Sequence, residues 1–153
     1  MTTSLEIKEK RYSVEEWLAL ERRSDIRHEY VYGKLIPMAG EAKRANKIAK
    51  NLVKLMDDPL YERGFDTFTH DVKAEVVPDG IYRYPDFVVA PLVDDEDDYI
   101  VKHAVLMAEV ASEESNNRDR VKKRKEYHNI PTLWYYLIIS QDEMLIEFHT
   151  RDQ

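Results

Sequence analysis

The stretch Ala104-Val-Leu-Met-Ala-Glu-Val-Ala111 decides the fold, because it reads as a β-strand buried in the core of a sheet. Its one charged residue is Glu109. Burying a carboxylate is costly, so Glu109 requires a cation, a hydrogen-bond network or an open cleft. A second carboxylate, Asp86, opens the apolar strand-like run Pro85-Asp-Phe-Val-Val-Ala90. Two acids on core strands, followed by a lysine-rich segment, indicate a divalent-metal site that acts on phosphate esters.

A basic segment, Arg118-Asp-Arg-Val-Lys-Lys-Arg-Lys125, follows the Glu109 strand and carries six basic side chains against one acid. In a helix, Asp119, Lys123 and Tyr127 fall on one stripe. If this helix packs beside the strand, Lys123 leans toward the same cleft, where its charge stabilises the transition state of phosphoryl transfer. The alternatives are a solvated helix face and a surface ion pair between Asp119 and Lys123, and spacing alone leaves them open.

The kind of metal follows from the available ligands. Hard oxygen ligands, without cysteine or paired histidines, favour Mg²⁺ or Mn²⁺ over Zn²⁺. The five histidines are scattered without ligand spacing, and we interpret each as a surface or satisfied histidine: His28, His70, His103, His128 and His149. Glu29 is a further acid, and it either bridges to the metal site through water or is an ordinary turn acid.

Length and composition bound the class of protein. The chain has 153 residues, the size of one domain, and we expect residues 12–150 to form it, with residues 1–11 a flexible N-terminus. The lack of cysteine excludes disulfides and thiolate metal sites. The sequence contains neither a bilayer-spanning stretch nor a secretory signal, so we expect a cytoplasmic location and no membrane partner. The net charge of −7 argues against a passive nucleic-acid coat protein.

Hydrophobic periodicity and turn residues predict alternating helices and strands. A helix over 14–23 is capped by Ser13 and Glu16, and a hairpin over 30–38 turns at Gly33. The remaining expected elements are a helix over 42–57 ended by Pro59, strands over 67–77 and 82–90, an acidic loop over 94–102, the strand 104–111, a helix from Asn116 or Asn117 to about His128, and strands over 133–139 and 144–149. The order predicts an α/β domain with a mixed sheet.

The ordered set Tyr84-Pro-Asp86, then Ala108-Glu-Val-Ala-Ser112, then Asp119-x-x-x-Lys123-x-x-x-Tyr127 resembles the PD-(D/E)XK nuclease superfamily. More narrowly, the chain resembles the Uma-type restriction endonuclease family. The opening Tyr12-Ser-Val-Glu-Glu-Trp17, the segment from Glu29 to Gly40, and Ile130-Pro-Thr-Leu-Trp-Tyr-Tyr-Leu137 carry the same resemblance. It covers about residues 12–148.

The resemblance implies a restriction-endonuclease-like fold, a mixed sheet flanked by helices, and a metal-dependent endonuclease that hydrolyses DNA. It implies that Asp86 and Glu109 bind Mg²⁺ (or Mn²⁺) together with the backbone carbonyl of Val110. Lys123 takes the place of the superfamily lysine, because residue 111 is alanine. Glu29 matches a further catalytic acid, and Asp119 and Tyr127 match supporting positions. Arg118, Arg120 and Lys122 are expected to contact the DNA backbone, and a homodimer is expected by analogy.

The sequence also departs from the family pattern. The family carries a histidine near the start of the second helix, and the best-matching position here is Ala45. The usual C-terminal segment is shortened at Gln153. These departures and the charge of −7 favour an alternative, a catalytically inactive nuclease-fold binding or structural module. A third alternative is a generic acidic α/β domain whose carboxylates lie at surface-facing strand ends.

Overall fold

The computed structural model describes residues 9–92, 97–114 and 117–151. Residues 1–8, residues 94–96, Asn116 and Gln153, on which sequence-based expectations fell, lie outside the described residues. Three helices are present in the described part: α1 (Val14–Glu21), α2 (Lys43–Tyr61) and α3 (Asn117–His128). The strands are β1 (His28–Val31), β2 (Lys34–Pro37), β3 (Phe65–Thr69), β4 (Lys73–Val77), β5 (Ile81–Arg83), β6 (Phe87–Pro91), β7 (Ile100–Val101), β8 (Leu106–Ala111), β9 (Tyr135–Ser140) and β10 (Ile146–Thr150).

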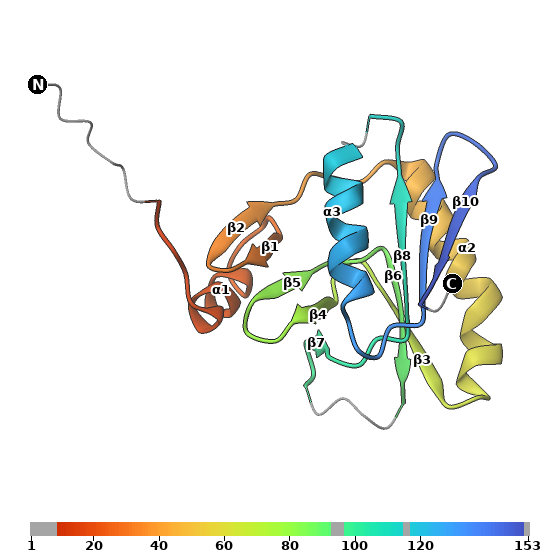
Figure 1. Ribbon diagram of the computed structural model, residues 1–153, viewed down its shortest axis with the longest axis horizontal. Coiled ribbons are helices and arrows are strands. Elements are labelled where there is room, and N and C mark those ends of the chain that lie inside the picture. The colour runs from red at the N-terminus through yellow and green to blue at the C-terminus, as the bar shows by residue number, and fades with distance from the viewer. Residues whose placement is uncertain (1–8, 93–96, 115–116, 152–153) are drawn as a thin grey trace, which may run out of the picture.

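The strands form two five-stranded sheets (Figure 1). The first sheet has the order β2-β1-β5-β4-β7, and the second has the order β10-β9-β8-β6-β3. Each is mixed, because β4–β7 and β8–β9 are parallel pairs and the other pairs are antiparallel. The predicted α/β class is confirmed, although the strands divide between two sheets.

Two helices cover the two faces of the second sheet. Because successive strand residues point to opposite faces, alternate residues of β6, β8 and β9 enter different cores. One set packs with the apolar residues of α2, and its strand members are Phe87, Val89, Leu106, Ala108 and Ile139. The other set packs with Tyr127 of α3 and includes Val88, Ala90, Met107, Ala111, Tyr136 and Ile138. Glu109 has the parity of Met107 and Ala111, so its side chain belongs to the face that α3 covers.

The N-terminal elements follow the sequence closely. The Ser13 hydroxyl accepts from the Glu16 N–H, and the Glu16 carboxylate accepts from the Ser13 N–H, which confirms the capping box. Trp17 of α1 is fully buried against the first sheet. The β1–β2 hairpin turns at Tyr32 and Gly33, both with positive φ, as a two-residue hairpin turn requires.

The single strands expected over 67–77 and 82–90 are wrong, because each is two strands. The chain leaves the second sheet after β3, turns through His70 with φ of 47°, and enters the first sheet as β4. It returns between β5 and β6 through Tyr84, Pro85 and Asp86. The local sequence hides both crossings, because apolar residues typical of strands continue on either side of each one.

The expectation that α2 ends before Pro59 is also wrong, because the helix runs through Pro59 to Tyr61. Pro59 lies in the last turn, so it disturbs only one backbone hydrogen bond, and the apolar face still packs on the second sheet through Leu60. Leu55, expected on that face, is 73% exposed. No helix in the described ranges is long and apolar enough to cross a bilayer.

Candidate metal-dependent nuclease site

The strand register brings the two predicted acids together. Phe87 of β6 pairs with Ala108 of β8, so the next antiparallel position places Asp86 opposite Glu109. The backbone N–H of Val110 donates to Asp86 Oδ2 at 2.7 Å, which fixes the Asp86 carboxylate against β8. The backbone carbonyl of Val110, the expected third ligand, belongs to the same strand segment.

The helix α3 presents Lys123 and Tyr127 to Glu109. The Tyr127 hydroxyl donates to Glu109 Oε1 at 2.8 Å, and Lys123 Nζ lies 3.7 Å from the same oxygen. Lys123 Nζ also lies 3.4 Å from Glu29 Oε1 and 3.9 Å from Asp119 Oδ2. The Lys123 side chain is 15% exposed. The stripe predicted from helical spacing therefore faces the Glu109 strand, and the Asp119 contact is one part of a larger cluster.

A buried arginine ties the first sheet to α3. Arg83 Nη1 of β5 donates to Glu29 Oε2 of β1 at 2.6 Å, and Arg83 Nη2 and Nε donate to the Glu126 carboxylate at 2.9–3.1 Å. Arg83 is 1% exposed and Glu29 is 4% exposed. Glu29 is therefore a buried acid between Arg83 and Lys123, and the interpretation as an ordinary turn acid is wrong.

Sequence reasoning missed Arg83 and Glu126. The available signal was the one that singled out Glu109: Arg83 is the one charge in the run Ile81-Tyr-Arg-Tyr84, immediately before Pro85. A buried charge requires a partner. The partner could not be named, because Glu29 and Glu126 lie far from Arg83 along the chain.

Burial and charge shift the pKa values of these groups. Burial raises the pKa of Glu109 to about 7; Lys123 opposes this rise, and Asp86 and Glu29 add to it. Burial also raises the pKa of Asp86, and the Val110 hydrogen bond opposes that shift. Burial alone would lower the pKa of Lys123, but Glu109, Glu29 and Asp119 outweigh it and hold the pKa above its ordinary value. The Lys123 ammonium thus forms ion pairs with three carboxylates.

These residues fit a divalent cation. Asp86 and Glu109 are carboxylates that lie opposite one another on neighbouring strands, and the raised pKa of each records mainly the free-energy cost of holding a negative charge away from water. A cation bound between them would remove that cost. The available donors are carboxylate oxygens and a nearby backbone carbonyl, the ligand class that Mg²⁺ and Mn²⁺ prefer. The third alternative is wrong in its premise, because both side chains are largely buried.

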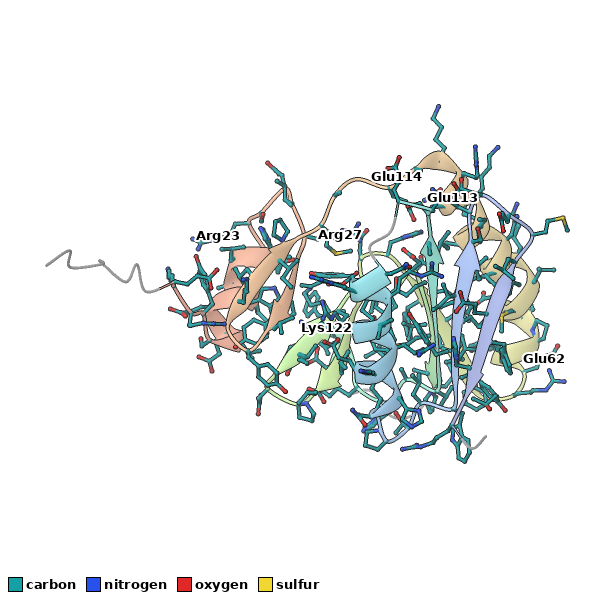
Figure 2. All side chains as sticks on the ribbon, turned by 45° about the horizontal axis from the view of Figure 1, so that its top comes forward. Arg23, Arg27, Glu62, Glu113, Glu114 and Lys122 are labelled. Carbon is teal, nitrogen blue, oxygen red and sulfur yellow. The ribbon has the colours of Figure 1, made fainter. Side chains whose placement is uncertain are left out.

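The three expected DNA-contacting residues lie on different sides of α3. Arg118 and Lys122 are exposed one helical turn apart, beside the Lys123 stripe. Figure 2 labels Lys122 on α3. Arg120 projects toward β10, where its Nη2 donates to Glu147 Oε1 at 2.9 Å. The structure therefore does not bring all three to one surface.

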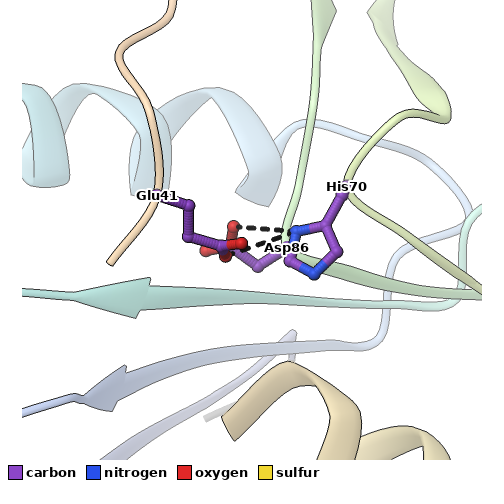
Figure 3. Close-up of side chains that lie close together, drawn as sticks. All are labelled: Glu41, His70 and Asp86. Carbon is purple, nitrogen blue, oxygen red and sulfur yellow. Dashed lines mark ion pairs between the residues drawn. The ribbon is translucent and has the colours of Figure 1, made fainter. Parts of the chain in front are cut away.

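A third cluster borders Asp86 from the other direction. His70 Nδ1 lies 3.3 Å from Glu41 Oε1 and 4.0 Å from Asp86 Oδ1 (Figure 3). Within the described ranges, these are the three residues whose potential metal-ligand atoms all lie within 4.8 Å of one another. Sequence reasoning did not predict this cluster, since the three residues come from the segment before α2, the β3–β4 turn and the segment just before β6.

Two hollows in the surface lie away from these acids. One, of about 470 Å³, lies at the C-terminal end of α3 and is lined by basic and aromatic residues including Arg124, His128 and Trp134. Another, of about 520 Å³, is lined by apolar residues of α2 and the second sheet. Neither contains a carboxylate among its lining residues, so neither offers the oxygen ligands that the cluster around Glu109 contains.

Comparison with known structures shows the same fold. A solved structure from Anabaena variabilis, titled as a putative nuclease belonging to DUF820, superposes with a TM-score of 0.75. The match covers 93% of this chain and 81% of that one, at 17% sequence identity. The restriction-endonuclease-like fold class expected from the sequence is therefore confirmed.

Sequence comparison supplies the family. The "Uncharacterized protein sll1609" of Synechocystis is 30% identical over 129 residues, which cover 82% of this chain and 73% of that protein. A second Synechocystis protein, "Uncharacterized protein slr1290", is 29% identical over 142 residues, covering 92% and 75%. The model of the Uma2 family, described as "Putative restriction endonuclease", matches residues 14–153. The chain therefore belongs to the Uma2 family, as the resemblance indicated.

Proposed function

We propose that the chain is a metal-dependent endonuclease that hydrolyses phosphodiester bonds in DNA. The observation that carries the proposal is the position of Lys123 Nζ, 3.7 Å from a Glu109 carboxylate that lies opposite Asp86. Glu109 of β8 is thus in contact with an amine from α3 and lies opposite an acid from the segment before β6. The family and the structural neighbour support a nuclease-like function.

Asp86 and Glu109 would hold Mg²⁺ or Mn²⁺, with the backbone carbonyl of Val110 as a further ligand. When bound, the ion would lower the pKa of a water molecule and neutralise charge on the scissile phosphate. Lys123 would place its ammonium beside the phosphate and stabilise the charge that develops in the transition state.

The remaining residues orient these groups. The Tyr127 hydroxyl holds one oxygen of Glu109, so that the carboxylate has a fixed direction. Glu29 holds the Lys123 ammonium from the other side, and Arg83 in turn holds Glu29. Asp119 approaches Lys123 from the preceding helical turn. Glu29 and Asp119 thus keep Lys123 protonated and positioned.

DNA contacts extend the proposal to the surface. Arg118 and Lys122 lie beside the Lys123 stripe, where their charges would contact the phosphate backbone. Arg120 would do so only after leaving Glu147. The proposal includes a homodimer, because a two-fold protein suits a symmetric duplex. It also includes the cytoplasmic location expected from the sequence.

The experiment is plasmid nicking by the purified chain in Mg²⁺ or Mn²⁺. We expect nicking by the wild type and its loss in Glu109→Gln and in Lys123→Ala. Lys125→Ala is the matched control, since Lys125 is exposed on the same helix. Activity that survives both substitutions would contradict the proposed roles.

An inactive nuclease-fold module is the second candidate. It is favoured by Ala45, which is buried in α2 where the family is expected to carry a histidine. Calorimetry separates the two candidates without any DNA. An active site binds Mg²⁺ with measurable heat that Glu109→Gln removes, whereas an inactive module shows no binding at millimolar Mg²⁺.

A further inference from the structure

Glu41, His70 and Asp86 converge from three parts of the chain that are distant in sequence. Glu41 lies on the segment before α2, His70 at the turn between β3 and β4, and Asp86 just before β6 (Figure 3). Phe87 pairs with Thr69 across β6 and β3, so the next position of that register places Asp86 opposite His70. Asp86 therefore has Glu109 on one side and His70 on the other.

Both carboxylates direct one oxygen toward the imidazole. Glu41 Oε2 accepts from the Asn46 amide at 3.1 Å, which leaves Oε1 facing His70 Nδ1. Asp86 Oδ2 accepts from the Val110 N–H, which leaves Oδ1 facing the same nitrogen. The protein donors thus hold the two carboxylates in place and turn their other oxygens to a common point. Such outer contacts are typical of metal ligands.

The distances are longer than a hydrogen bond and leave room for an ion between the groups. An N–H···O hydrogen bond spans about 2.7–3.2 Å, and the His70 Nδ1 contacts are longer, at 3.3 and 4.0 Å. Donor atoms that bind one ion at about 2.1 Å lie roughly 3.0–3.4 Å from one another. The Glu41 distance already satisfies this condition, and the Asp86 distance requires a side-chain adjustment of less than about 1 Å.

Partial burial suits a ligand site that remains accessible. The side chains of His70, Glu41 and Asp86 are 20%, 24% and 22% exposed, so an ion can enter while most of the surrounding water is excluded. Arg27 supports the turn from behind, since its Nη1 donates to the His70 carbonyl at 2.6 Å and pairs with Asp71. The turn is thus held by contacts that leave the imidazole directed at the carboxylates.

We propose that Glu41, His70 and Asp86 bind a divalent transition-metal cation, at a site separate from the pair formed by Asp86 and Glu109. One imidazole nitrogen and two carboxylate oxygens favour ions such as Co²⁺, Zn²⁺ or Mn²⁺, whereas Mg²⁺ prefers oxygen ligands alone. Asp86 borders both sites. His70 is then a ligand, in contrast to its interpretation from the sequence as a surface or satisfied histidine.

The test uses metal-free full-length chain without nucleic acid. Co²⁺ is titrated calorimetrically into the wild type, His70→Ala, Glu41→Gln and the control His128→Ala, whose histidine is exposed on α3. The series is repeated in the Glu109→Gln background, which disables the acid pair and keeps the His70 cluster. Thermal unfolding shows that each variant is folded.

We expect His70→Ala and Glu41→Gln each to weaken binding of one Co²⁺ ion by at least about 10-fold, and His128→Ala to leave it unchanged. In histidine labelled with ¹⁵N, the ring resonances of His70 should shift when Zn²⁺ is added. Two results would overturn the proposal: an unchanged Co²⁺ affinity in His70→Ala, or His70 ring resonances that do not shift when Zn²⁺ is added. Either result would show that the cluster is an ion pair and not a metal site.

The result is independent of the proposed nuclease function. The rise in unfolding midpoint caused by Mg²⁺ reports the Asp86–Glu109 pair, and we expect His70→Ala to retain it. Loss of Co²⁺ binding at His70 with retained Mg²⁺ binding confirms two separable sites. Conversely, Co²⁺ binding at His70 without any nicking of DNA would confirm this site and contradict the nuclease proposal.

Discussion

Lys123 Nζ lies 3.7 Å from Glu109 Oε1, and both groups are largely withdrawn from water. They come from two consecutive elements, the strand β8 and the helix α3. The contact matters because Lys123 also lies close to Glu29 and Asp119, so a single ammonium stabilises three acids. The balance of charge at this point determines both the stability of the fold and the cation affinity that we propose.

The first prediction concerns the pH dependence of stability in the metal-free protein. The pKa of Glu109 rises from 4.5 to about 7 on folding, so the folded chain binds this proton more tightly than the unfolded chain does. The stabilisation from that proton is complete below about pH 4.5 and is lost as the pH rises through about 7. Replacing Glu109 with neutral glutamine removes this loss.

The wild type therefore loses stability as the pH rises from 4.5 to 8, and Glu109→Gln does not. We expect the unfolding free energy of Glu109→Gln, measured relative to wild type, to increase by about 2–3 kcal/mol over this pH range. Urea unfolding across this range measures it. Glu62→Gln, at the exposed residue that follows α2, is the control and should change the unfolding free energy by less than about 0.5 kcal/mol (Figure 2). A constant difference for Glu109→Gln would contradict the burial of an ionisable carboxyl.

The second prediction concerns Arg83. Arg83→Met leaves Glu29 and Glu126 without their buried cation, and removing one partner of a buried ion pair typically costs about 3–5 kcal/mol. We expect a loss of that size, and a smaller loss in Arg83→Lys, which keeps the charge but not the forked geometry. Chemical unfolding at pH 7 provides the measurement.

Arg23→Met is the matched control, because Arg23 is exposed on the segment after α1 (Figure 2). It should change stability by less than about 0.5 kcal/mol. If Arg83→Met were equally mild, Arg83 would not be the link between the first sheet and α3.

The third prediction concerns DNA binding by the surface of α3. In the Glu109→Gln background, which prevents cleavage, Arg118→Ala and Lys122→Ala should each weaken binding uniformly across sequences. Each should also reduce the slope of log affinity against log salt by about 1, since each removes one phosphate contact. Fluorescence anisotropy at several salt concentrations gives these slopes.

Lys54→Ala removes the same charge from an exposed position on α2 and should leave the slope unchanged. Slopes that are identical in all three variants would show that DNA does not contact this part of α3.

Much of this arrangement is predictable from local pattern. The strand containing Glu109, the capping box at Ser13 and the hairpin at Gly33 each follow from residues that are close in sequence. The stripe that carries Lys123 follows from helical spacing, and the structure places it against the expected strand.

The unpredicted parts depend on where the chain crosses between sheets. His70 and Asp86 mark the two crossings, and strand-like sequence on both sides of each residue conceals them. The contacts of Arg83 with Glu29 and Glu126, and of His70 with Glu41, join residues whose proximity is set by those crossings. The sequence pattern within a single strand or helix does not show where the chain crosses between sheets, so it does not predict these contacts.

Crystals of the chain soaked in Mn²⁺ test the central claim most directly, because the anomalous signal locates the ion without reference to activity. The account predicts an anomalous peak between the carboxylates of Asp86 and Glu109, with the Lys123 ammonium directed into the same pocket. A site without Mn²⁺ between these two carboxylates at millimolar concentration, or a Lys123 side chain turned to the outer surface of α3, would contradict it.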